Sequence, residues 1–119
     1  MNFTSEKAIY IQIADRLCDE ILTGKFVDDG RIPSVREYAV LLEVNTNTTV
    51  KSYDLLEQQG VIYKKRGLGY FVTPGAKQQI LRERRKEFME ARLPEMFRQM
   101  RLLGIGIEEV EERWNDDGS

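Results

Sequence analysis

A row of amide and hydroxyl side chains lies near the middle of the chain, at residues 45–49, which read NTNTT. These short polar groups cannot build an apolar core, but their donors and acceptors match those on base edges in the major groove of DNA. An Asn side chain can pair bidentately with adenine, and Thr offers a hydroxyl and a methyl group to thymine. The alternative is helix capping, because Asn45 is a good N-cap and Thr48 can satisfy backbone groups of the first turn.

The residues after this row predict a helix over about residues 46–59. Thr49, Tyr53 and Leu56 share one face of that helix, and we expect this face to be buried. The opposite face remains available to a partner and carries Thr46, Asn47, Val50, Lys51 and Asp54.

Basic residues gather in two places, although the net charge of the chain is −2, which is not the charge expected of a nucleic-acid binder. Lys64-Lys65-Arg66 form a basic turn with Gly67 and Gly69, which favours contact with phosphate over a merely solvated turn. The second cluster, at residues 82–86, is explained by helix-surface ion pairs with neighbouring glutamates. A local patch can still attract phosphate within a Debye length of about 8 Å.

The residue types required for most catalytic and metal sites are missing. The chain of 119 residues contains no histidine and one cysteine, Cys18, and it has no glycine-rich phosphate-binding motif. We therefore expect no enzyme, no metal and no cofactor. The single cysteine predicts a reduced, cytoplasmic protein, and we expect neither a signal peptide nor a membrane helix.

Two helices are predicted before the polar row. Apolar residues recur at steps of three and four over residues 6–23, and Gly24 ends that helix. Ser34 and Glu37 form the S-x-x-E pattern of a capping box, which starts a second helix. We expect this second helix to bury Tyr38, Leu41 and Leu42.

Two short β-rich stretches follow the third helix. Gly60 ends that helix, and VIYKKRGLGYFVTP at 61–74 predicts a hairpin. We expect Tyr63 and Tyr70 to flank a tight tip that presents Lys64, Lys65 and Arg66. Two helices joined by a short turn, then a hairpin, predict an α+β fold: a winged helix-turn-helix domain over residues 1–75 with its wing at 64–69.

The remaining residues, 76–119, predict a two-helix tail. The first helix runs from Ala76 to about Met100, Pro94 should kink or restart it, and Leu103-Gly104 should stop it; Ile107, Val110 and Trp114 mark a short last helix. Two amphipathic helices cannot close a core alone, so we expect a homodimer held by the tail, with residues 1–75 folded but largely monomeric. The expected dimerisation residues are Phe88, Met89, Leu93, Met96, Phe97, Met100 and Trp114.

Several of these stretches together resemble a known family. R31-I-P-S-V-R-E37, T48…Y53…L56-E57…G60-V-I and G67-L-G-Y-F-V72 resemble the winged-helix domain of GntR-type bacterial transcription regulators, over about 70 of the 119 residues. The short two-helix tail and the NTNT at 45–48 resemble the YtrA-type branch, whose members dimerise through the tail.

The resemblance implies roles for individual residues. Arg36 matches an arginine that contacts phosphate or base at the start of the second helix, and Gly67 and Gly69 match a wing tip that approaches the minor groove. Positions facing the major groove are matched by Thr46, Asn47, Thr48 and Val50. Lys51, Lys65 and Arg66 are assigned to phosphate from their charge and position.

The leading hypothesis is therefore a dimeric, sequence-specific regulator that binds a double-stranded DNA operator, with repression as its expected effect. The alternative is a winged-helix module that binds protein without specific DNA binding. A metabolite sensor is a third class, but 44 tail residues cannot enclose a cavity of ~300 Å³ within one chain. A small effector bound between subunits stays open and is not required by the sequence.

Overall fold

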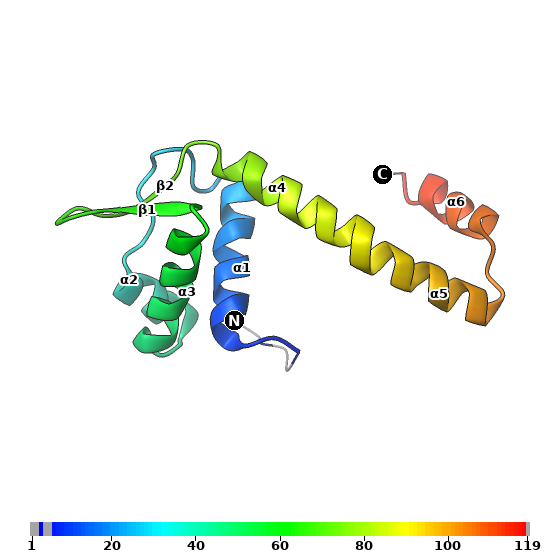
Figure 1. The fold of residues 1–119 in the computed structure, drawn as a ribbon, viewed down its shortest axis with the longest axis horizontal. Helices are drawn as coiled ribbons and strands as arrows, with labels where there is room; N and C mark the ends of the chain where they lie inside the picture. Colours follow the sequence, from blue (N-terminus) through cyan, green and yellow to red (C-terminus); the bar gives the residue numbers. More distant parts are fainter. Residues whose placement is uncertain (1–2, 4–5, 119) are drawn as a thin grey trace. The chain divides into compact units, whose positions relative to one another are not determined.

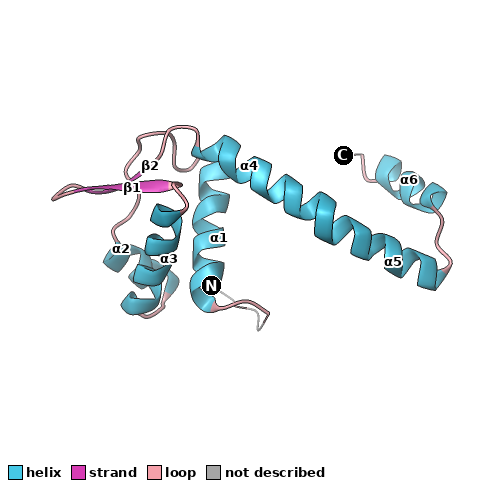
Figure 2. Ribbon diagram, viewed as in Figure 1, coloured by secondary structure: helices cyan, strands magenta, loops and turns pink. Residues whose placement is uncertain are grey.

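The structure is a computed structural model that describes residue 3 and residues 6–118, and the chain folds as two compact units, Met1–Arg82 and Glu83–Ser119. The first unit contains α1 to α3, a hairpin and the start of α4 (Figures 1 and 2). Their bounds are α1 Ile9–Leu22, α2 Val35–Leu42, α3 Thr46–Gln58, β1 Ile62–Lys65, β2 Gly69–Val72 and α4 Ala76–Glu87. This order confirms the predicted α+β winged helix-turn-helix fold.

The first two helices differ from prediction at their ends and on one face. α1 begins at Ile9 rather than at residue 6, because Glu6 and Lys7 form a bend before it. In α2 the side chain of Leu41 is 58% exposed, so the prediction that it is buried is wrong. The buried face of α2 consists of Tyr38, Ala39 and Leu42, and Leu41 points away from it.

The capping box of α2 is confirmed. The backbone N–H of Glu37 donates to the Ser34 hydroxyl at 3.1 Å, and the backbone N–H of Ser34 donates to the Glu37 carboxylate at 3.0 Å. The hydrogen bonds from the backbone and side chain of Ser34 lower the pKa of Glu37. The start of α2, where Arg36 lies, is therefore held in a defined geometry.

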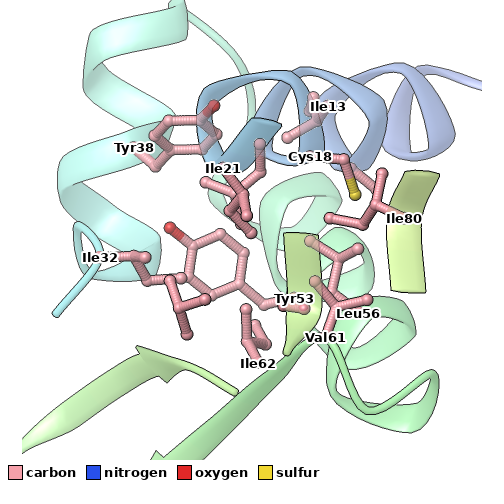
Figure 3. Packing of buried hydrophobic residues seen from close by; sticks show 14 of the residues in the cluster. Ile13, Cys18, Ile21, Ile32, Tyr38, Tyr53, Leu56, Val61, Ile62 and Ile80 are labelled. Carbon is pink, nitrogen blue, oxygen red and sulfur yellow. The ribbon is translucent and has the colours of Figure 1, made fainter. Parts of the chain in front are cut away.

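The core of the first unit lies where α1, α2, α3 and the hairpin meet (Figure 3). Tyr38 and Tyr53 lie at its centre with ring centroids 6.1 Å apart. The Tyr53 hydroxyl donates to the Pro33 carbonyl at 2.6 Å, and the Tyr38 hydroxyl donates to the carboxylate of Glu20. Burial raises the pKa of both tyrosines, so both hydroxyls stay protonated and act as donors.

The start of α4 also belongs to this core. Ala76 is 1% exposed and Ile80 is 3% exposed, and both pack in the same cluster as the residues of α1 and α3. The domain boundary at residue 75 stays a prediction. A truncation that keeps this core intact must include Ile80, and the first compact unit ends at Arg82.

The second unit is helical. It contains the end of α4, a π-helical turn η1 at Phe88–Arg92, α5 at Leu93–Leu103 and α6 at Ile107–Asp116. In η1 the N–H of Leu93 bonds to the carbonyl of Phe88, five residues back, immediately before Pro94. Pro94 lacks an N–H, and the wide turn accommodates it at the start of α5, as the predicted restart requires. Gly104, with φ +69°, ends α5 as predicted.

None of the helices in the described part of the chain has both the length and the apolar character needed to cross a membrane.

Candidate nucleic-acid interface

The turn between α2 and α3 is built by two residues with defined roles. Glu43 ends α2 in the left-handed conformation, with φ 56°, and Asn45 caps α3 by accepting the N–H of Asn47 at 2.7 Å. The capping role of Asn45 is thereby confirmed, and its side-chain oxygen serves the helix. The Thr and Asn residues after it are not needed as the N-cap.

One face of α3 is fixed in the core. Thr49, Ser52, Tyr53 and Leu56 are buried, as predicted for three of them. The Ser52 hydroxyl donates to the carbonyl of Tyr10 in α1 at 2.6 Å and thereby pins α3 to α1. The sequence analysis missed Ser52, although its position next to Tyr53 and three residues after Thr49 was a signal for burial.

The other face of α3 is open. Thr46, Asn47 and Lys51 are exposed, Val50 is 39% exposed, and Thr48 is half-buried. Arg36 is exposed near the start of α2. The residues expected to read DNA therefore lie on helices whose opposite faces are packed in the core.

The hairpin tip is a tight turn. The N–H of Leu68 donates to the carbonyl of Lys65 at 2.9 Å, and Gly67 has φ +77°, the value that the third residue of a type II turn requires. A Cβ on Gly67 would meet no atom within 4 Å, so the glycine is needed for its positive φ and not for lack of space. Arg66 lies in this turn and is exposed.

The two lysines before the turn are not at the tip. Lys64 and Lys65 belong to β1 and pair with Tyr70 and Gly69, so the expectation that all three basic residues occupy the tip holds only for Arg66. The ammonium of Lys65 lies 5.0 Å from the ring centre of Phe71, and that of Lys64 lies 5.7 Å from the ring of Tyr70. Successive strand residues point to opposite faces, so the lysines lie on the two faces of the wing.

The hairpin is anchored at its base. Tyr70 packs edge-on against Tyr53 of α3, with ring centroids 5.1 Å apart. On the other face Tyr63 stacks on Phe71 at 5.7 Å, and its hydroxyl donates to Asp29 at 2.7 Å. That bond raises the pKa of Tyr63. The wing is therefore tied both to α3 and to the loop before α2.

The apolar residues of the tail beyond α4 are either exposed or only half-buried within the chain. None of the residues of η1, α5 and α6 is buried. Of the expected dimerisation residues, Leu93, Phe97 and Met100 are half-buried, and the exposed ones are Phe88 at 50%, Met89 at 58%, Met96 at 39% and Trp114 at 68%.

The described part of the chain holds no group of three side chains suited to bind a metal ion, and Cys18 is a buried, free thiol.

Comparison with known proteins shows which family and which proteins this chain is similar to. Residues 9–72 match the family model for bacterial regulatory proteins of the gntR family. The HTH-type transcriptional repressor YtrA of Bacillus subtilis is 30% identical over 108 residues, which are 91% of this chain and 82% of that protein. The family description and the name of this relative both denote transcriptional regulators and not enzymes.

Two solved structures extend the comparison. A GntR family transcriptional regulator from Listeria monocytogenes superposes with a TM-score of 0.79 at 32% identity, covering 96% of this chain and 98% of that one. The DNA-binding domain of AraR in complex with operator ORX1 superposes with a TM-score of 0.54 at 27% identity, covering 60% of this chain and 93% of that one.

Proposed function

The chain belongs to the GntR family of bacterial regulatory proteins, and from this premise we propose that it is a homodimeric repressor that binds a double-stranded DNA operator. The observation that carries the proposal is the two-sided character of α3. One side is held by Tyr53, Leu56 and the Ser52–Tyr10 hydrogen bond, and the other presents Thr46, Asn47, Val50 and Lys51. A helix fixed in this way can insert into the major groove without losing its packing.

The residues of the interface divide into base readers and phosphate contacts. Asn47 is our candidate for bidentate pairing with adenine, and Thr46, Thr48 and Val50 are suited to contact thymine methyl groups. Arg36 and Lys51 are our candidates for contact with DNA phosphates. We also propose that Arg36 contacts a base. These phosphate contacts set the register of the helix on the duplex.

The wing supplies the second contact. Gly67 has no side chain, so the backbone at this one position of the turn can approach the edge of the minor groove. Arg66 at the tip and Lys65 in β1 place positive charge beside it, and Gly69 ends the turn with φ +106°. The ammonium of Lys65 lies 5.8 Å from the ring centre of Tyr63 and 5.0 Å from that of Phe71, and these contacts restrict its position.

Dimerisation by the tail is supported by its uncovered apolar residues. A helix with such a stripe is stabilised by packing against a partner. A second copy of the chain provides a matching surface, because a two-fold interface joins the same patch of both subunits. The two-fold dimer would present two identical α3 helices to DNA.

Repression is supported by the name of the relative YtrA. We also propose a cytoplasmic location, because the proposed operator DNA is found there. A protein-interaction module is the competing function, favoured by the net charge of −2 and by the exposed apolar residues Val40 and Leu41 on α2.

Mutation of the wing distinguishes the DNA-binding function from the protein-interaction function. Replacing Lys65 and Arg66 together by Ala should lower the slope of log affinity against log salt by up to about 2, because each neutralised phosphate contributes about 0.9. The measurement is DNA binding by fluorescence anisotropy at several salt concentrations. Both side chains are exposed, so the circular dichroism spectrum should not change.

The matched control replaces Lys77 and Arg82 by Ala, which removes the same two charge types from exposed positions of α4. The control should keep the wild-type slope. A slope of the wing variant equal to that of the wild type would remove the wing from the interface and favour the protein-interaction module.

A further inference from the structure

Arg31 joins the sheet of the wing from outside the hairpin. Its backbone pairs antiparallel with Phe71 of β2. The flanking bonds run from the N–H of Ile32 to the Tyr70 carbonyl and from the N–H of Val72 to the Gly30 carbonyl, both at 3.0 Å. Directly opposed residues of an antiparallel pair point to the same face, so Arg31 lies on the face of Phe71.

Gly69 lies on that same face, because it is two residues before Phe71. A Cβ on Gly69 would lie 3.4 Å from Nε of Arg31 and 3.8 Å from its Nη2. The Arg31 side chain therefore runs across the bare backbone of Gly69. This differs from Gly67, where a Cβ would meet nothing within 4 Å.

The backbone under Arg31 is held firmly. The next residue, Ile32, is 1% exposed and points into the core beside Tyr53 (Figure 3). The Arg31 side chain itself is on the exposed side of the sheet, where Lys65 also lies. A guanidinium positioned in this way loses little further freedom when it binds an anion.

Arg31 also lies close to the start of α2. Its positive charge contributes to the lowered pKa of Glu37, after the two hydrogen bonds from Ser34. The two charged groups are not within 4.0 Å of each other, and Arg31 forms no ion pair with another residue in the described part of the chain. Its donors are therefore available to an anion, at a position that connects the wing to the helix bearing Arg36.

We propose that Arg31 is a further phosphate-contacting residue and that Gly69 supplies the space that positions its guanidinium; the assignment rests on the proposed DNA-binding function. The positive charge of Arg31 would then lie between two parts of the interface, the wing and the start of α2. Arg is suited to this role because its planar fork can bind two phosphate oxygens at once. In this account Gly69 acts through Arg31, as a positioning residue.

Arg31→Ala tests the contact in the full chain. We expect the salt slope to fall by about 0.9, which is one phosphate contact. The loss of affinity between about 50 and 200 mM salt should accordingly be ~3.5-fold smaller than for the wild type. Binding to the operator and to unrelated DNA should weaken by the same factor, since a phosphate carries no sequence information. Arg31→Lys should keep most of the slope, and Arg82→Ala should keep all of it.

Gly69→Ala and Gly67→Ala test the positioning. Both glycines have positive φ, so both changes strain the backbone, but only a Cβ on Gly69 meets Arg31. In a double-mutant cycle, Gly69→Ala should lower the salt slope in the wild type and have no such effect in the Arg31→Ala protein. Gly67→Ala should show no coupling with Arg31.

The possible results for these variants distinguish the role of Arg31 from the proposed DNA-binding function. A wild-type slope for Arg31→Ala, with an unchanged thermal midpoint, would overturn the assignment while leaving the DNA-binding function intact. A lower thermal midpoint with an unchanged slope would assign Arg31 to stability of the sheet and would also overturn it. If the wild-type protein binds no DNA, the proposed function fails and the role of Arg31 falls with it.

Discussion

Replacing Met89 and Met96 by Glu in the full chain should convert the proposed dimer into a monomer. Both residues belong to the uncovered apolar residues of the tail, and both are exposed within the chain, at 58% and 39%. The substitutions should leave each chain folded, because neither side chain belongs to a core. In the dimer they would place charges in an apolar interface, which is strongly unfavourable.

Operator binding should weaken with the loss of the dimer. Two linked recognition helices bind with an avidity that exceeds a single site by about 10²–10⁴-fold, and the monomer loses this advantage. Sedimentation at micromolar concentration measures the oligomeric state, and anisotropy with operator DNA measures the affinity. A chain that ends at Arg82, which keeps the core intact, should behave in the same way.

The control variant replaces Gln78 by Glu and Asn115 by Asp. It also adds two negative charges, at exposed positions that are not among the expected dimerisation residues. It should remain dimeric. If the Met89 and Met96 variant sediments as a dimer while staying folded, the interface lies elsewhere and the proposed role of the tail is wrong.

Asn47→Ala should abolish discrimination at one base pair of each half-site. A bidentate base contact contributes about 1–3 kcal/mol, so the preference for the correct base should fall by about 5- to 150-fold at that position and remain elsewhere. The fold should not change, because the N-cap is Asn45 and uses the backbone N–H of residue 47, which alanine retains.

Phosphate contacts provide the comparison for this variant. Arg36→Ala and Lys51→Ala should each weaken binding to all sequences and lower the salt slope by about 1. Competition with single-base variants of the operator distinguishes the two patterns. Full discrimination at every base pair by the Asn47→Ala protein would refute its assignment as a base reader.

The elements of the domain were predictable because their signals are local. Ser34 and Glu37 are three residues apart and cap each other, and Asn45 caps α3 within two residues. The glycines of the hairpin mark a turn that the chain closes over a few residues. The buried face of α3 also follows from spacing alone.

The missed features depend on contacts between distant segments. Nothing near Arg31 in the sequence indicates that it pairs with Phe71, forty residues later, or that Gly69 makes room for it. Leu41 looked buried because it is apolar and follows Tyr38 at a helical step, but the packing direction of α2 places Ala39 inside instead. Ile80 was assigned to the tail, yet it completes the core of the first unit.

Selection of bound sequences from random DNA by the purified protein, followed by footprinting of the enriched sequence, tests the central claim most directly. Two identical recognition helices related by a two-fold axis should select a pseudo-palindrome whose half-site centres lie about one helical turn, or a multiple of it, apart. Protection should then cover both half-sites at the same protein concentration. The absence of any enriched sequence, or a single asymmetric half-site at saturation, would contradict a dimeric, sequence-specific DNA-binding regulator.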